Sequence, residues 1–180
     1  AVDSAESSII KKVPDINLSE WHLAYYAYAG GEQIDLGDLS ESEELFEHGG
    51  SAFVASNLWF QWKGPVTEKE DIEYGNTDIL TDKELQDKYY NSADYHLKNA
   101  YIFNFDDENY ENQNMILKDF LLKGLAVDAS YYNDSNYYDS VHNSYMSGQN
   151  NTSTHSVTII GYDDNFSAEN FSSGAKPKNN

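Results

Sequence analysis

The residues best suited to chemistry lie near the C-terminal end, in the sequence THSVTIIGYDD at residues 154–164. His155 precedes the β-branched residues Val157 and Ile159, and Gly161 with the aspartates after it supplies turn chemistry. This pattern predicts a buried strand with a histidine at its start. A strand orients such an imidazole while leaving it in solvent, which suits a group that exchanges protons near neutral pH. The alternative is a partly exposed histidine with a purely structural role.

The composition limits the partners that the chain can bind. Its 180 residues include 31 acidic and 11 basic ones, the latter all lysine, and its net charge is −20. Such a surface repels phosphate backbones and anionic lipids, so we expect no nucleic-acid binding. No apolar run approaches the roughly 18 residues of a membrane-spanning helix, so we also expect no membrane insertion.

Cysteine is absent from the chain, which removes disulfides, thiolate zinc sites and a thiol nucleophile within it. His22, His48, His96 and His142 lack the spacing of a zinc motif, and residues 163–165 lack the ligand spacing of an EF-hand. We therefore expect neither a metal site nor a cofactor.

A pair of glycines, Gly49 and Gly50, separates an acidic stretch from an apolar one with helical periodicity. The residues alone leave two interpretations open. The pair is either a turn into the helix or a place where an extended peptide approaches the backbone closely. The aromatic residues that follow, Phe53, Trp59 and Trp62, are expected in the core rather than in a sugar-stacking site.

Apolar periodicity and turn residues predict helices first and strands later. The predicted helices cover residues 2–13, 19–30, 49–64 and 112–124, and the predicted strands cover residues 97–105, 125–131 and 154–160. The polar, irregular residues 66–95 indicate a crossing between two lobes. This order favours an α+β fold, with a helical lobe over residues 1–80 and a β-rich lobe over residues 81–180 that carries His155.

Several further segments are informative because of the order in which they occur along the chain. They are AESSII at 5–10, LSEWHL at 18–23, EHGG at 47–50, GLAV at 124–127, THSV at 154–157 with Gly161-Tyr162, and the tail at 171–180. Together they resemble the papain family of cysteine peptidases, most closely its bacterial secreted branch. The resemblance spans nearly the whole chain, although GLAV stands where the family usually has Gly-Pro-Val.

The resemblance implies a two-lobe papain-like fold, with a helical lobe followed by an antiparallel sheet or barrel. It makes His155 the catalytic base, and it places Gly49, Gly50 and Thr154 along the substrate cleft. It also implies a peptide or protein substrate, a monomer, and a secreted or cell-surface location.

The resemblance further implies that two members of the catalytic triad lie outside this sequence. The family's cysteine would lie just before Ala1, and the asparagine that orients the histidine would lie just after Asn180. We therefore expect an internal fragment, truncated at both ends, that keeps only His155 of the triad. By itself this fragment is predicted to be inactive, because a base without a thiol has nothing to activate.

Two alternatives belong to other functional classes. A papain-like module that has lost its nucleophile would bind without catalysis, and the residues of this chain do not separate it from the enzyme. A carbohydrate-binding domain would instead use the tyrosines and tryptophans on its surface, including the Tyr/Asn/Ser-rich residues 131–145.

Overall fold

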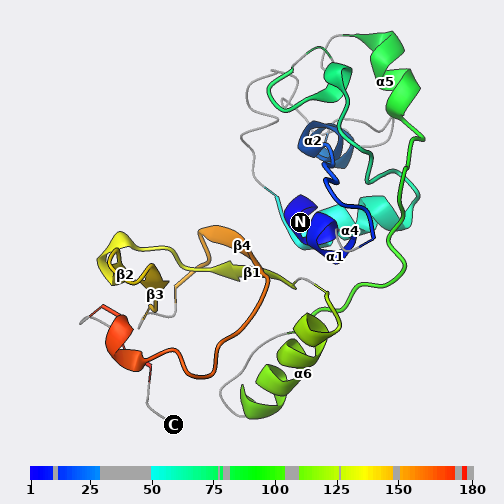
Figure 1. Cartoon of the computed structure of the whole chain (residues 1–180). Helices are drawn as coiled ribbons and strands as arrows, with labels where there is room; N and C mark the ends of the chain where they lie inside the picture. The colour runs from blue at the N-terminus through cyan, green and yellow to red at the C-terminus, as the bar shows by residue number, and fades with distance from the viewer. Residues whose placement is uncertain are drawn as a thin grey trace. The chain divides into compact units, whose positions relative to one another are not determined.

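The computed structural model has an α+β fold, and it divides into two compact units, Ala1–Tyr110 and Glu111–Asn180 (Figure 1). The residues that the structure describes are 1–9, 12–28, 50–76, 78, 82–103, 110–125, 127–147, 151–172 and 176–177. The sequence suggested a boundary between lobes after residue 80, whereas the boundary between the two units falls between residues 110 and 111. Each unit is described by itself below.

The first unit is built from short helices, and three of them begin at a residue whose side chain caps the helix. The helices are α1 (Val2–Ile9), α2 (Glu20–Tyr28), α4 (Ala52–Phe60) and α5 (Lys83–Tyr89), with the 3₁₀ turn η1 (Glu70–Ile72). The Ser19 hydroxyl accepts from His22 N at 3.0 Å, as the predicted N-cap of α2 requires. Ser51 caps α4 and Asp82 caps α5 in the same way.

The core of the first unit draws on most of its length. Its buried hydrophobic residues are Val2, Leu18, Tyr25, Tyr26, Ala55, Leu58, Trp59, Val66, Ile72, Leu85 and Tyr89. The prediction that residues 66–95 form an irregular crossing is wrong, because four of these core residues come from that segment. Leu85 and Tyr89 lie one helical turn apart on α5, so a mostly polar helix still buries one narrow face.

Only part of the expected aromatic core is buried. Leu58 and Trp59 face the interior, but Phe53 is 60% exposed and Trp62 is 61% exposed. The helix α4 is apolar around its whole circumference, so one side packs against α2 and the core while the other remains outside. In α1, Val2 is buried and Ala5 packs against the core, while Ile10 lies outside the described residues.

The helix α6 (Tyr110–Leu122) begins two residues before the expected Asn112 cap. It ends as predicted at Gly124, whose φ of +77° is a left-handed conformation that glycine adopts without strain. Gly124 N donates to Leu121 O at 2.9 Å and Leu125 N donates to Phe120 O at 3.0 Å. This pair of bonds is a Schellman motif, and it turns the chain from the helix into the following strand.

Two small antiparallel sheets follow in the second unit. The strand β1 (Val127–Tyr131) pairs with β4 (His155–Ile159), in a register running from Val127 opposite Ile159 to Tyr131 opposite His155. The strand β2 (Tyr138–Asp139) pairs with β3 (Ser144–Tyr145). The 3₁₀ turns η3 (Ser135–Tyr137) and η4 (Ala168–Asn170) complete the unit. Within the described residues these sheets form no closed barrel.

Two strand predictions need correction. Residues 97–103 form no strand, and Tyr101, Ile102 and Phe103 in that segment are exposed. The strand at His155 exists, but it is not buried: its first three residues are exposed and its last two are half-buried. A ladder of two strands offers little surface to cover either face, so β-branched residues in it stay partly in solvent.

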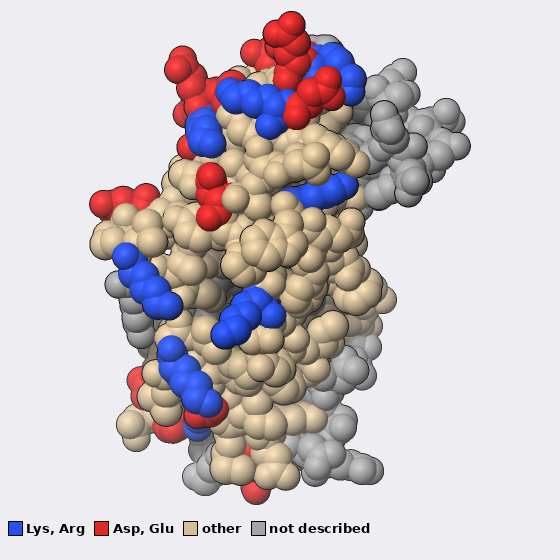
Figure 2. Space-filling view, turned by 90° about the vertical axis from the view of Figure 1, so that its right-hand side faces the viewer, with Lys and Arg blue, Asp and Glu red and all other residues tan. Residues whose placement is uncertain are grey.

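Charged side chains lie mainly on the surface. Figure 2 shows lysines beside acidic residues at the top of the view. On and near α5, Lys83 pairs with Asp87 and Lys88 pairs with Asp71. None of the helices that the structure describes is both long enough and apolar enough to cross a membrane.

Candidate functional site

The predicted base, His155, is the first residue of β4, and its backbone is fixed by the ladder. It lies opposite Tyr131 in the register, and the two rings meet edge to face with their centroids 5.5 Å apart. The histidine is exposed, and its ring nitrogens make no hydrogen bond to the part of the chain that the structure describes. An exposed imidazole held by its backbone and by one neighbouring ring is a candidate for proton transfer.

Thr154, which was expected along a substrate cleft, makes two hydrogen bonds at the junction of β1 and β4. Its backbone N–H donates to Tyr131 O at 3.0 Å, and its hydroxyl accepts from Asn133 N at 3.0 Å. These two bonds join the end of β1 to the start of β4. The side chain therefore holds the two strands together directly beside His155, and its hydroxyl oxygen is already engaged.

The glycine pair is only partly within the described structure. Gly50 is exposed and lies immediately before Ser51, the N-cap of α4, while Gly49 lies outside the described residues. The position of Gly50 agrees with the interpretation of a turn into a helix, and its exposed backbone remains accessible. Gly50 belongs to the first unit, and Thr154 and His155 belong to the second.

An open cavity of about 410 Å³ lies in the second unit, between the end of β1, the end of β3 and the segment before β4. Tyr131, which contacts His155 on one side, lines this cavity and meets the ring of Tyr145 with centroids 5.1 Å apart. The Tyr145 hydroxyl donates to Tyr132 O and accepts from Asp134 N, so its ring is fixed. The sequence pointed to the tyrosine-rich segment but not to a cavity next to the histidine.

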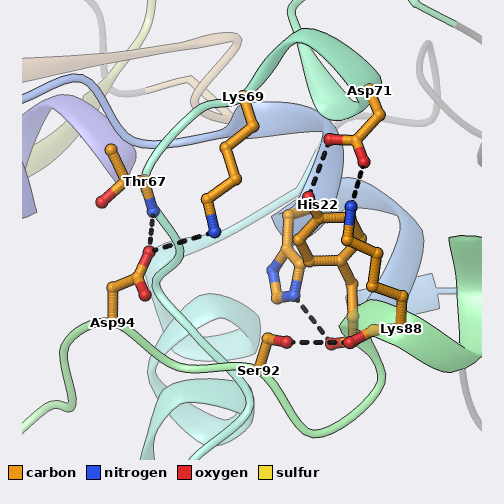
Figure 3. A network of polar contacts seen from close by, with 8 residues as sticks. His22, Thr67, Lys69, Asp71, Lys88, Ser92 and Asp94 are labelled. Atoms are coloured by element: carbon orange, nitrogen blue, oxygen red, sulfur yellow. Dashed lines mark hydrogen bonds and ion pairs between the residues drawn. The ribbon is translucent and has the colours of Figure 1, made fainter.

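The first unit contains a second notable histidine that the sequence did not single out as buried. His22, on α2, is 1% exposed, and its Nε2 lies 3.3 Å from the carbonyl oxygen of Tyr89 (Figure 3). A carbonyl only accepts, so Nε2 carries the proton and Nδ1 is bare. Nδ1 is buried with no hydrogen-bond partner among the described residues.

Burial determines the protonation state of this histidine. It lowers the pKa of His22 from 6.5 to about 4, against smaller opposing effects of the Tyr89 carbonyl and Asp94. The charged groups around it are engaged with one another. Lys88 and the Tyr89 hydroxyl both bind Asp71, and Asp94 accepts from Thr67 N and pairs with Lys69 (Figure 3). His22 is therefore neutral at pH 7, and the charged groups around it stabilise the fold by pairing with one another.

The remaining titratable groups form no evident metal centre. No group of three or more histidine or acidic side chains within the described residues is arranged to hold an ion. His142 contacts Asp139 at 3.1 Å on the surface, where that carboxylate also accepts from the backbone of Val141 and His142. This arrangement closes the turn between β2 and β3.

Comparison with known proteins adds no relative: no family model, curated protein or solved structure matches the chain. Function is therefore inferred from the residues and from the geometry of each unit. In that geometry the most distinctive feature is His155, exposed at the start of β4 and adjoining a cavity through Tyr131.

Proposed function

We propose that this chain carries the proton-transferring histidine of a papain-like cysteine peptidase. The observation that carries the proposal is the setting of His155. Its backbone is held by the β1–β4 ladder and by the Thr154 hydrogen bonds, while the residue itself is exposed. The order of papain-like segments along the sequence supports the same function.

In this mechanism the imidazole first takes the proton of a cysteine thiol, and the thiolate attacks the carbonyl carbon of the peptide bond. The imidazolium then gives that proton to the nitrogen of the leaving amine as the carbon–nitrogen bond breaks. Water, deprotonated by the same imidazole, releases the acyl group from the sulfur. The edge contact with Tyr131 restricts the histidine ring, so that part of its orientation is set before substrate arrives.

The 180 residues contain no thiol, so by themselves they should not hydrolyse peptides. The decisive experiment is to read the codons before Ala1 and after Asn180 and, if they extend the reading frame, to express the longer chain. A cysteine upstream and an asparagine downstream, with hydrolysis of a fluorogenic peptide that iodoacetamide blocks and His155→Ala removes, is the expected result.

Two results would contradict the proposal. Serine, alanine or glycine at the expected nucleophile position would favour a non-catalytic binding module. Peptidase activity that survives His155→Ala would show that another group is the base. Tyr162→Phe, which alters an exposed ring of the same unit, is the control for general damage to the fold.

A further inference from the structure

The cavity beside His155 has a chemistry of its own. Its wall consists of three tyrosines, three serines, one asparagine and one methionine. In a chain whose net charge is −20, none of the described residues that line it carries a carboxylate or an amine. Its volume of about 410 Å³ falls within the range of about 300–1,000 Å³ that is usual for small-molecule sites.

Four polar side chains of the wall are open to a ligand. The hydroxyls of Tyr131, Tyr132 and Ser153 and the side-chain amide of Asn151 make no hydrogen bond within the described part of the chain. Each hydroxyl can donate and accept, and the amide supplies both a donor and an acceptor. The tyrosine rings between them provide apolar surface. The cavity therefore offers hydrogen bonds of both directions without a fixed charge.

Another part of the wall is held in place before any ligand enters. The Tyr145 ring is fixed by its two hydroxyl hydrogen bonds, and the Ser130 and Ser156 hydroxyls lie 3.0 Å apart across the β1–β4 ladder. Little rotamer freedom remains to be lost at these positions on binding, which favours affinity and selectivity.

We infer that this cavity receives an uncharged, hydrogen-bonding side chain of the peptide substrate, such as tyrosine, glutamine or asparagine, close to the bond that His155 acts on. The inference rests on the proposed function. Tyr131 contacts the His155 ring and also lines the cavity, so a peptide bond held at the imidazole would place a neighbouring side chain near the cavity. A carboxylate or an ammonium group would lose water without meeting an opposite charge, so acidic and lysine side chains are disfavoured.

The first arm of the test uses the 180-residue chain and needs no catalysis. Nuclear magnetic resonance titrations with the N-acetyl amides of tyrosine, glutamine, lysine and glutamate should shift the signals of the cavity residues. The two neutral ligands should saturate at concentrations at least about tenfold lower than the two charged ones. Tyr132→Phe and Asn151→Ala should each weaken binding about threefold to tenfold, as expected for the loss of one hydrogen bond. Tyr162→Phe, outside the cavity, should leave it unchanged.

The second arm scans substrate positions on both sides of the cleaved bond with the longer chain. A preference for neutral polar residues at one position, reduced by Asn151→Ala, supports the inference. Hydrolysis with no such preference overturns the inference while the proposed function stands. Selective binding in the first arm without hydrolysis in the second leaves the cavity assignment in place as a binding site and refutes the peptidase.

Neutral sugars supply the remaining comparison in the first arm. Maltose and N-acetylglucosamine carry hydroxyls and an apolar ring face, so they also match the wall chemistry. If either saturates the cavity more tightly than every amino-acid amide, or if no ligand shifts the cavity signals, the peptide assignment is overturned.

Discussion

Acidification should destabilise the first unit through a single buried histidine. The folded pKa of His22 is about 4 and its ordinary value is 6.5, so between these pH values the unfolded chain binds a proton that the folded chain does not. Stability therefore falls as the pH drops from about 6.5 towards 4. At about 1.4 kcal/mol for each tenfold change in proton affinity, the full loss is about 3 kcal/mol. Above pH 6.5 both states are neutral and the effect vanishes.

The structural cause of this loss is specific. Protonation places a hydrogen on Nδ1, which has no acceptor among the described residues and lies against Gly64. The variant His22→Gln keeps a side-chain N–H that can reach the Tyr89 carbonyl but cannot titrate. It should be less stable than the wild type at pH 7, and the difference between the two proteins should shrink by about 3 kcal/mol at pH 4.

Urea melts followed by tryptophan fluorescence measure this directly, because Trp21, Trp59 and Trp62 all belong to the first unit. Melts at several pH values between 7 and 4 give the free energy of unfolding for both proteins. Carboxylates titrate in the same range, but they do so in both proteins and cancel in the difference. A wild type that loses no more stability than His22→Gln, or a His22 resonance that titrates near 6.5, would refute the reasoning.

Three further changes test the packing of the first unit, each by urea melts. Gly64→Ala should lower the free energy of unfolding by about 2 kcal/mol or more, because φ is +91° there and the added Cβ would lie 3.1 Å from His22 Cε1. The control Gly75→Ala has a similar φ of +93° but open space around it, so it should show only the smaller backbone cost. Leu58→Ala should cost about 2–5 kcal/mol, whereas Phe53→Ala, on the exposed side of α4, should cost under about 1 kcal/mol. Asp82→Ala should cost about 1 kcal/mol, because it removes the acceptor for two N–H groups of α5, and an unchanged midpoint would argue against this cap.

Local sequence signals anticipated the elements that are fixed by local chemistry. Ser19 before an apolar run marked the start of α2, and Gly124 after another marked the end of α6, because caps and left-handed glycines act over a few residues. The helix α5 carried a similar signal in Asp82, but its mostly polar composition hid the narrow face that Leu85 and Tyr89 bury. A helix that contributes two side chains to a core produces only a weak periodicity.

In the candidate site, too, features set by local sequence could be predicted and features set by pairing between distant segments could not. His155 and its strand could be predicted, since a β-branched run with a turn after it is a local pattern. The contact with Tyr131 and the cavity behind it arise from pairing between segments more than twenty residues apart, and no local spacing encodes that register. The exposure of β4 was missed for a related reason: the pattern predicts a strand, but the number of neighbouring strands decides how deeply it is buried.

His22 and His155 have opposite environments, and the difference distinguishes a structural histidine from one proposed to act in catalysis. His22 lies in the LSEWHL segment that contributes to the papain resemblance, yet it is buried, neutral and enclosed by the core. His155 is exposed, and its backbone is fixed by the β1–β4 ladder, so its imidazole lies at the surface and not in a core. The LSEWHL segment therefore supports the fold, and the chemistry proposed for this protein belongs to the THSV segment alone.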